Sequence, residues 1–210
     1  MTTESAPGRD RILEIIAVLI LGITTLGTAW CGFEASQWNG RNADLAREAS
    51  DQHVEAARLF GVATQKIGYD ATMVAQYAMA KSEGKENLLE FYRTTLIRPD
   101  FLPILDQWEA EIAAGQTPTP LLDDADYLTA QLADYQQVVA TGEQLTSDSQ
   151  EAGDIASKYV GMTILLAAAL FFAGVTSSFK YRPAKVLLIA AALVTMAYAA
   201  SRLSTLPVLL

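Results

Sequence analysis

The chain has 210 residues, of which 51% are hydrophobic, and a formal net charge of −9. Its length would suit one ordinary soluble domain, but its charged and apolar residues are segregated along the sequence. Residues 34–158 hold 21 acidic and 9 basic side chains, a net charge of −12. This balance excludes a nucleic-acid-binding face, which needs clustered Lys and Arg, and argues against docking on anionic lipid headgroups.

The first apolar run covers residues 15–33 and contains no charged side chain. Its length matches the roughly 20 residues that a helix needs to cross a lipid bilayer. It is flanked by arginines and by aromatic residues typical of a membrane interface: Arg9, Arg11, Trp30, Phe33 and Trp38. We therefore expect a first transmembrane helix over residues 15–33, after an N-terminal segment of residues 1–14.

Two processing alternatives bear on this run. A lipoprotein signal is excluded, because Trp30 rather than a small residue precedes Cys31. Cleavage as a signal peptide stays open, because Gly27 and Ala29 stand in a small-x-small arrangement. The run is longer than a usual signal-peptide core, which favours an uncleaved anchor. Cys31 is the only cysteine, so it permits no internal disulfide and is expected to pack as a small hydrophobe.

Two more apolar runs, residues 159–179 and 184–202, predict two further transmembrane helices. The turn between them, residues 180–183, is so short that these two helices must be antiparallel neighbours. Lys185 and Arg202 are expected to extend their charges to opposite membrane surfaces. No ionisable residue lies in the middle of a span, which argues against a proton relay or an ion-coupled transporter.

The orientation follows from the basic residues of the short turn. Lys180, Arg182 and Lys185 have no acidic neighbour there, so the positive-inside rule predicts a cytoplasmic turn. Residues 1–14 are then cytoplasmic as well. The inserted domain, residues 34–158, and the C-terminal tail, residues 203–210, are expected on the extracytoplasmic side.

The inserted domain shows helical periodicity in its first half. From residue 35 to about 82 there is no proline, and small or apolar residues recur by threes and fours, which predicts one long helix with a packing stripe. The stripe comprises Leu45, Ala49, Ala56, Leu59, Ala63, Ile67, Ala71, Val74 and Ala78. A solvated face is expected opposite, at Arg47, Asp51, Glu55, Arg58 and Lys66.

A second long helix is predicted after Asp123, Asp124 and Asp126, which suit a helix N-terminus. Its stripe steps from Leu128 to Tyr159 and enters the second apolar run without a break. The two long helices are expected to pack against each other as an antiparallel hairpin. The predicted fold is an all-α membrane protein with three transmembrane helices and an inserted extramembrane helical hairpin or bundle.

The middle of the inserted domain predicts two shorter amphipathic helices, over residues 87–96 and 101–113. Pro99 ends the first, and Pro103 is tolerated in the first turn of the second. This region concentrates aromatic and charged residues, and it is the candidate partner or pocket surface: Glu90, Tyr92, Arg93, Arg98, Asp100 and Trp108. The alternative, which the amphipathic spacing favours, places Phe91, Tyr92, Phe101 and Trp108 in a small core.

No catalytic, cofactor-binding or metal-binding constellation emerges from the sequence. His53 is the only histidine, and its neighbours one helical turn away are Ala49 and Ala57, so no metal-ligand pair forms. A triad with Cys31 is disfavoured, because the two residues lie far apart along an extended helix. Helix capping accounts for Asp123, Asp124 and Asp126 better than a calcium loop, since the closing Glu is missing.

Several motifs together resemble a family of bacterial membrane proteins of uncharacterised function and similar length. They are Trp30, Gln37-Trp38-Asn39-Gly40, Glu90-Phe91-Tyr92, the helix ending near Trp108, and Leu170-Phe171-Phe172-Ala173-Gly174. The resemblance covers most of the chain. It implies a bacterial inner membrane and the same topology, and it transfers no site residue.

The sequence thus favours a non-enzymatic bacterial integral membrane protein, set in the lipid bilayer, whose helical domain mediates protein–protein interaction or assembly. The partner would be a second copy of the chain or another membrane protein. The first alternative is a ligand-sensing membrane module that acts through a separate output protein. The second is an oligomeric channel.

Overall fold

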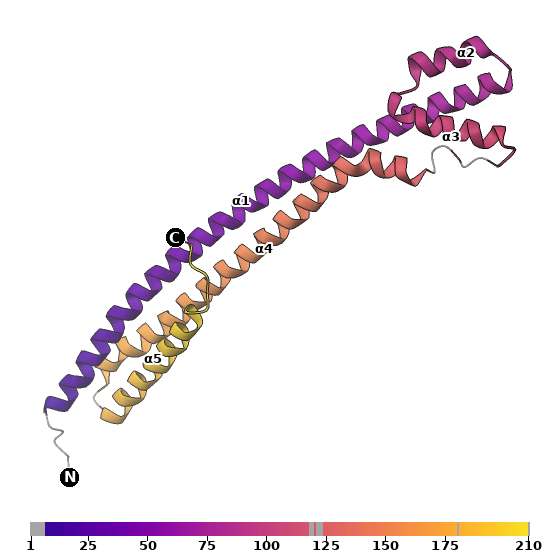
Figure 1. Cartoon of the computed structure of the whole chain (residues 1–210). Coiled ribbons are helices and arrows are strands. Elements are labelled where there is room, and N and C mark those ends of the chain that lie inside the picture. Colours follow the sequence, from indigo (N-terminus) through magenta and orange to yellow (C-terminus); the bar gives the residue numbers. More distant parts are fainter. Residues whose placement is uncertain (1–6, 118–119, 121–123, 180, 210) are drawn as a thin grey trace. The chain divides into compact units, whose positions relative to one another are not determined.

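The computed structural model describes residues 7–117, 120, 124–179 and 181–209. All regular elements in these ranges are helical, which confirms the predicted all-α class. Three helices are long and apolar enough to cross a membrane, as predicted: α1 (Pro7–Ser82), α4 (Ala125–Val175) and α5 (Arg182–Leu203). The shorter elements are α2 (Glu86–Phe91), the π-helical turn η1 (Tyr92–Leu96), the 3-10 turns η2 (Pro99–Phe101) and η3 (Thr176–Ser178), and α3 (Leu102–Ala113) (Figure 1).

Helix α1 is unusually long because nothing interrupts it. Pro7 occupies its first position, where the missing N–H has no helical partner to lose, and no other proline follows in the helix. It ends where Gly84 takes a positive φ of 68°. The Gly84 N–H donates to the Lys81 carbonyl and the Lys85 N–H to the Ala80 carbonyl, at 3.2 and 3.0 Å. These two bonds form a Schellman cap, which a glycine makes without steric cost.

The described residues belong to two compact units. The terminal unit combines Met1–Arg47 with Leu145–Leu210, and the central unit is Glu48–Gln144. Helices α1 and α4 contribute residues to both. Each unit has its own buried apolar core.

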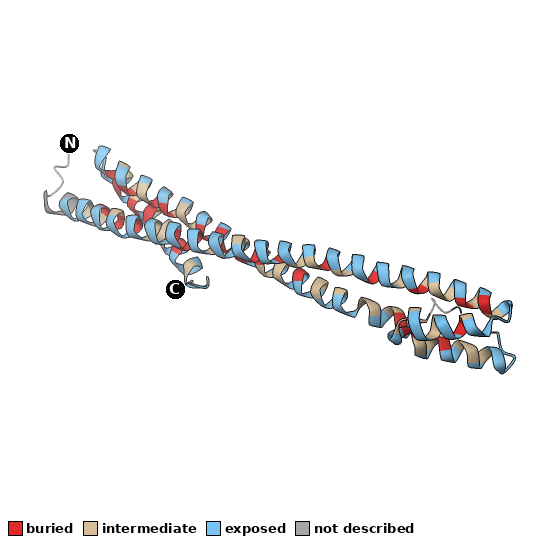
Figure 2. Cartoon of the chain, turned by 90° about the horizontal axis from the view of Figure 1, so that it is seen from above, coloured by how far each residue is buried: buried red, intermediate tan, exposed pale blue. Residues whose placement is uncertain are grey.

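In the terminal unit, α1 runs antiparallel to α4 and parallel to α5. Ile20 packs in one buried cluster with Ala173 of α4 and Ile189 of α5. Further along α1, Cys31 packs with Tyr159 of α4 and Ala199 of α5. The buried residues therefore lie on the sides of the three helices that face one another, and the outward sides are exposed (Figures 1 and 2).

In the central unit, α1 packs against α4 along the predicted stripe. Ala49, Ala56 and Ala63 are buried, and the remaining stripe residues of α1 in this unit are partly buried. The rings of Phe60 and Tyr135 lie 5.3 Å apart. The buried Gly142 of α4 leaves no spare room, since a Cβ atom there would meet the Gln52 side chain at 3.3 Å. Small residues thus allow close helix approach.

A compact core closes the central unit where α2, η1, η2 and α3 meet the ends of α1 and α4. Its buried members come from α1, α2, η2, α3, α4 and the residue that follows η1: Tyr77, Ala80, Leu89, Ile97, Phe101, Leu105 and Tyr127. Phe101 and Tyr127 meet edge to face, with centroids 5.2 Å apart. Tyr92 and Trp108 are partly buried against this core, as the core alternative predicted.

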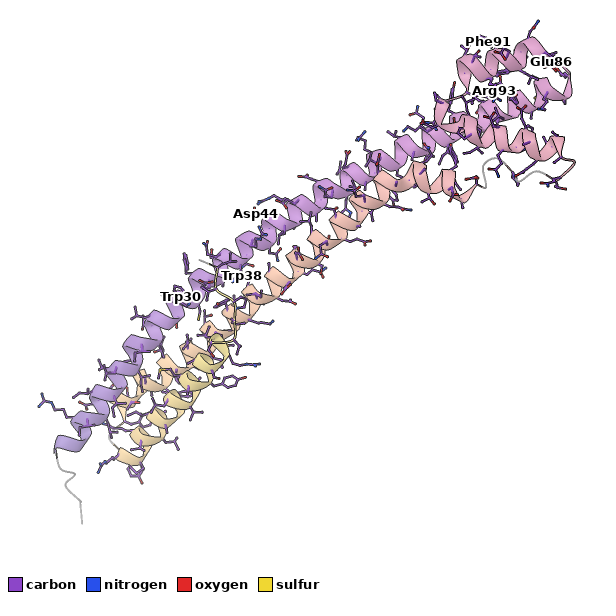
Figure 3. All side chains as sticks on the ribbon, in the orientation of Figure 1. Trp30, Trp38, Asp44, Glu86, Phe91 and Arg93 are labelled. Carbon is purple, nitrogen blue, oxygen red and sulfur yellow. The ribbon has the colours of Figure 1, made fainter. Side chains whose placement is uncertain are left out.

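Two details differ from the sequence predictions. The segment predicted as one helix over residues 87–96 is α2 followed by η1. Phe91, expected in the core, is 47% exposed (Figure 3), because Leu89 and Tyr92 occupy the face of the segment that meets the core. Lys185 is buried, and its Nζ lies 3.6 Å from Oε1 of the exposed Glu14.

Candidate functional site

The central unit contains a buried polar cluster, the Asp70 cluster, made of Asp70, Arg98, Tyr127 and Gln131. Asp70 lies on α1 and is only 1% exposed. The Arg98 guanidinium donates to it twice, from Nε to Oδ1 at 3.0 Å and from Nη2 to Oδ2 at 2.6 Å. The Tyr127 hydroxyl donates to Oδ2 at 2.5 Å, and Arg98 Nη2 also donates to Gln131 Oε1 at 3.3 Å.

Local sequence positions these groups. Arg98 precedes Pro99, whose ring disfavours helical backbone in the preceding residue, and Arg98 is extended with φ −65° and ψ 142°. The chain therefore leaves η1 and turns into η2 at Arg98. On α4, Asp124 caps the helix: its Oδ1 accepts the Tyr127 N–H at 2.7 Å. This cap confirms one of the predicted capping aspartates, and it fixes the first turn that carries Tyr127. Asp123 lies outside the described residues.

The Asp70 cluster changes the proton affinity of its members. Its hydrogen bonds with Asp70 raise the pKa of the Arg98 guanidinium above its ordinary value. Burial, followed by the hydrogen bond with the Asp70 carboxylate, raises the pKa of Tyr127 above its ordinary value. Arg98 therefore stays charged and Tyr127 stays neutral at physiological pH. A carboxylate that accepts three bonds, two of them from a cation, is compensated in the low-dielectric core.

A second polar cluster, the Glu109 cluster, joins α1, η1 and α3. The Tyr77 hydroxyl donates to Glu109 Oε1 at 2.8 Å, Lys81 donates to the same oxygen, and Arg93 Nη1 lies 3.3 Å from Oε2. Arg93 also pairs with Asp106. Burial alone would raise the pKa of Glu109, but hydrogen bonds from Lys81 and Tyr77 outweigh it and hold the pKa below its ordinary value.

The six residues predicted as a partner or pocket surface do not form one site. Arg98 belongs to the Asp70 cluster, and Asp100, 72% exposed, lies at 3.7 Å from its Nη1. Arg93 belongs to the Glu109 cluster, and Trp108 lies beneath the ammonium of Lys81 at 6.0 Å. The Tyr92 hydroxyl donates to Gln76 Oε1 at 2.8 Å, while Glu90 is exposed. Most of these side chains contact residues of another helical segment.

Asp70 is the site residue that the sequence prediction missed. It was assigned neither to the packing stripe nor to the solvated face of α1. The available signal was its position beside Ile67, Ala71 and Val74 of the stripe, because an acid among residues that face the core needs a buried cation.

A groove of about 570 Å³ lies next to the Asp70 cluster, and Tyr127 and Gln131 line it. Its other lining residues come from α1, η2, α3 and α4 and are rich in carboxylates: Lys66, Asp100, Pro103, Ile104, Gln107, Asp124, Asp126, Ala130 and Asp134. A groove with this lining is electrostatically suited to a cationic rather than an anionic group.

The described residues show no arrangement for catalysis by metal ions. Among them, no group of three or more His, Cys, Asp and Glu side chains is placed to hold a metal ion. His53 is exposed at the edge of a shallow groove lined by Ala56, Phe60 and Tyr135.

Comparisons with known proteins supply no relative. No protein-family model matches the chain, and neither the curated proteins nor the solved structures contain a significant match.

Proposed function

We propose that the chain is a non-enzymatic, multi-pass protein of the bacterial inner membrane. Its helical domain, residues 34–158, would lie on the extracytoplasmic side and act by assembly, with a second copy of the chain as the first partner.

The membrane assignment is supported by the outward faces of the terminal unit. All three of its long helices expose large apolar side chains that no other part of the described chain covers. Examples are Val18, Ile23 and Leu26 on α1, Ile164 and Phe171 on α4, and Leu187 and Val194 on α5. Apolar surfaces this extensive are unfavourable in water and favourable in hydrocarbon. The orientation rests on the basic residues around the turn that precedes α5.

The observation that carries the assembly proposal is an uncharged strip along the outer side of α1 in the central unit. Every member is exposed, and none is ionisable: Gly61, Val62, Thr64, Gln65, Gly68, Thr72, Ala75, Gln76 and Met79. At helical spacing these residues share one side of the helix. A Cβ atom added at Gly61 or Gly68 would meet nothing within 4 Å, so packing within the chain does not require glycine there.

The strip fits contact with another copy of the same chain. The inserted domain carries a net charge of −12, so two copies repel each other except where charge is absent. Interface cores are depleted in charged residues, and exposed glycines let two helix backbones come close. Glycine lowers helix stability by about 1 kcal/mol relative to alanine in a helix interior, and contact with a partner helix would offset that cost.

Light scattering coupled to size-exclusion chromatography in detergent tests the assembly. We expect the full-length chain to be oligomeric, and Gln65→Glu combined with Gly68→Glu to shift it toward the monomer, because each partner would then bring carboxylates into the contact. The matched control is Gln136→Glu combined with Gln137→Glu, which adds the same two negative charges at exposed positions of α4 in the same unit. A wild-type monomer, or equal oligomers in all three proteins, would refute the proposal.

The ligand-sensing alternative is favoured by the groove beside the Asp70 cluster. Its volume of about 570 Å³ falls within the range of small-molecule sites, roughly 300–1,000 Å³. A thermal-shift screen of the full-length protein against small metabolites, cationic amines included, distinguishes the two functions. A stabilising compound whose effect is lost in Gln131→Ala would support the sensor, and a screen without stabilising compounds would leave assembly ahead.

A further inference from the structure

A small cavity lies beside the C-terminal end of α5 in the terminal unit. Its volume is about 350 Å³, and α4, α5 and the segment after α5 supply its lining residues: Lys158, Met162, Arg202, Thr205 and Leu206. Two of these residues are basic and none is acidic. The lining is therefore opposite in charge to the groove beside the Asp70 cluster, and it suits an anionic group.

The two cations of this cavity are available to a ligand. Both side chains are exposed, and within the described part of the chain neither forms an ion pair or donates a hydrogen bond. Arg202 lies over the Tyr198 ring, 6.0 Å from its centre, a contact that leaves the N–H donors of the guanidinium unused. By contrast, Arg47, Arg58 and Arg98 are all paired with carboxylates.

The cavity lies at the level where two of the apolar runs end. Lys158 directly precedes the run over residues 159–179, and Arg202 is the last residue of the run over 184–202. Helices α4 and α5 are antiparallel neighbours (Figure 1), so the start of the first run and the end of the second lie side by side. In a membrane this level is the interface, where the phosphate groups of lipids are found.

The remainder of the cavity and the surface next to it are apolar. Met162 lies one helical turn after Lys158, on the same side of α4, and both Met162 and Leu206 are partly buried. Further along α4, Ile164 is 66% exposed. A ligand that fits this lining combines a negative group with a hydrocarbon chain. A free phosphate would use the two cations and leave the apolar part uncovered.

We propose that Lys158 and Arg202 bind the phosphate group of an anionic phospholipid, whose acyl chains lie along Met162 and the apolar side of α4. The phosphate oxygens accept charge-assisted hydrogen bonds from the ammonium and the guanidinium. The site selects lipids with a net negative headgroup, because the choline of a zwitterionic lipid cancels the phosphate charge. The acidity of residues 34–158 argues against a broad lipid-docking face, but the lining of this cavity contains no acid.

Native mass spectrometry of the full-length protein in non-ionic detergent tests the site, with equal amounts of phosphatidylglycerol and phosphatidylcholine added. We expect each chain to retain one phosphatidylglycerol in preference to phosphatidylcholine. One basic residue near an anionic headgroup contributes about fivefold in affinity, so Lys158→Gln combined with Arg202→Gln should weaken phosphatidylglycerol binding about 25-fold. Arg47→Gln combined with Arg58→Gln removes two positive charges from exposed ion pairs and should bind like wild type.

A second pair of variants separates charge from packing. Lys158→Arg combined with Arg202→Lys keeps both charges and should keep the preference for phosphatidylglycerol. Without lipid all these variants should unfold at the wild-type temperature, because the substituted side chains are exposed. Phosphatidylglycerol should then raise the unfolding temperature of every protein except the Lys158→Gln and Arg202→Gln double variant. Soluble glycerol phosphate in excess should not displace the lipid, and displacement would overturn the assignment to a lipid.

Equal retention of the two lipids by wild type, or an unchanged preference in the neutral double variant, would also overturn the proposal. The proposal rests on the membrane part of the proposed function and not on assembly. Centrifugation of lysed cells without detergent separates the two failures. Full-length protein in the soluble fraction would refute the membrane assignment itself, whereas membrane-bound protein without a lipid preference would refute only the lipid site.

Discussion

The Arg98 guanidinium and the Asp70 carboxylate meet face to face through two parallel hydrogen bonds. Asp70 is 1% exposed and Arg98 20% exposed on the side chain, so water contributes little to the solvation of either charge. This pair fastens the extended segment between η1 and η2 to α1. It thereby holds the chain that enters α3 against the core.

Loss of Arg98 should strongly destabilise the central unit. Arg98→Met keeps much of the side-chain volume but leaves the buried Asp70 carboxylate without its cation, and breaking a buried pair in this way costs about 3–5 kcal/mol. Hydrogen exchange of the full-length protein, followed by mass spectrometry, would report the loss in peptides from α1, α3 and the start of α4. Arg58→Met is the control, because the Arg58–Glu55 pair is exposed and its loss should be unmeasurable.

Restoring neutrality on both sides should recover part of that loss. Asp70→Asn combined with Arg98→Met removes the unpaired charge, so the double variant should be more stable than Arg98→Met alone. A double variant that is no more stable than the single one would show that packing of the arginine, rather than its charge, supports the fold.

We predict that the hydrogen-bonded hydroxyl of Tyr127 makes the protein lose stability at alkaline pH. Burial and the bond to Asp70 raise its pKa in the folded state. The contribution is fully present below the unfolded-state pKa of about 10 and is lost as the pH rises from there toward the folded-state pKa. Tyr127→Phe should cost about 1 kcal/mol at neutral pH, the usual value of one hydrogen bond, and should flatten the loss above about pH 10. Tyr135→Phe is the control and should leave that loss unchanged, because the Tyr135 hydroxyl makes no hydrogen bond within the described part of the chain. Denaturation measured at a series of pH values would compare the variants.

The sequence predicted what depends on local pattern. Steps of three and four residues identified α1 and α4 and the buried side at Ala49, Ala56 and Ala63, because helical geometry repeats every few residues. Apolar length identified the three helices that can cross a membrane. The Asp124 cap was readable for the same reason, since the acceptor and the N–H are three residues apart.

Contacts between distant parts of the chain were not predictable from pattern. Asp70 and Arg98 are 28 residues apart, and Glu34 and Leu209 are 175 residues apart. The segment that follows α5 folds back onto α1 because of the way α5 ends. The periodicity of the sequence does not predict this contact. The amphipathic spacing of residues 87–96 predicted that Phe91 is buried, but it is exposed, because the side of a short helical segment that meets the core depends on the segments that pack against it. Trp38 (labelled in Figure 3) packs against the buried cluster that contains Cys31, a contact that the sequence pattern did not predict.

We predict that the partly buried Glu109 carboxylate makes the protein lose stability at acidic pH. Although burial acts to raise its pKa, the bonds from Lys81 and Tyr77 hold the pKa of this carboxyl below its ordinary value. The stability it contributes is therefore present above the unfolded-state pKa of about 4.3 and is lost as the pH falls through the lowered folded-state pKa. Glu109→Gln should be less stable than wild type at pH 7, and the difference should shrink below about pH 4. Glu90→Gln, at an exposed acid of α2, is the control, and a difference that stays constant with pH would contradict the assignment.

The cap of α4 should be worth a measurable share of the stability of the central unit. In Asp124→Ala the Tyr127 N–H loses its acceptor, and caps of this kind contribute about 1 kcal/mol, with a range of roughly 0.5–2. The first turn of α4 would fray, and because Tyr127 sits in that turn, its bond to Asp70 would weaken with it. Hydrogen exchange should therefore accelerate at the start of α4 and also around Asp70 on α1. Asp134→Ala is the matched control: it removes an exposed acid of the same helix, and alanine favours the helix interior. Faster exchange that stays confined to the first turn of α4 would show that the cap and the Asp70 cluster act separately.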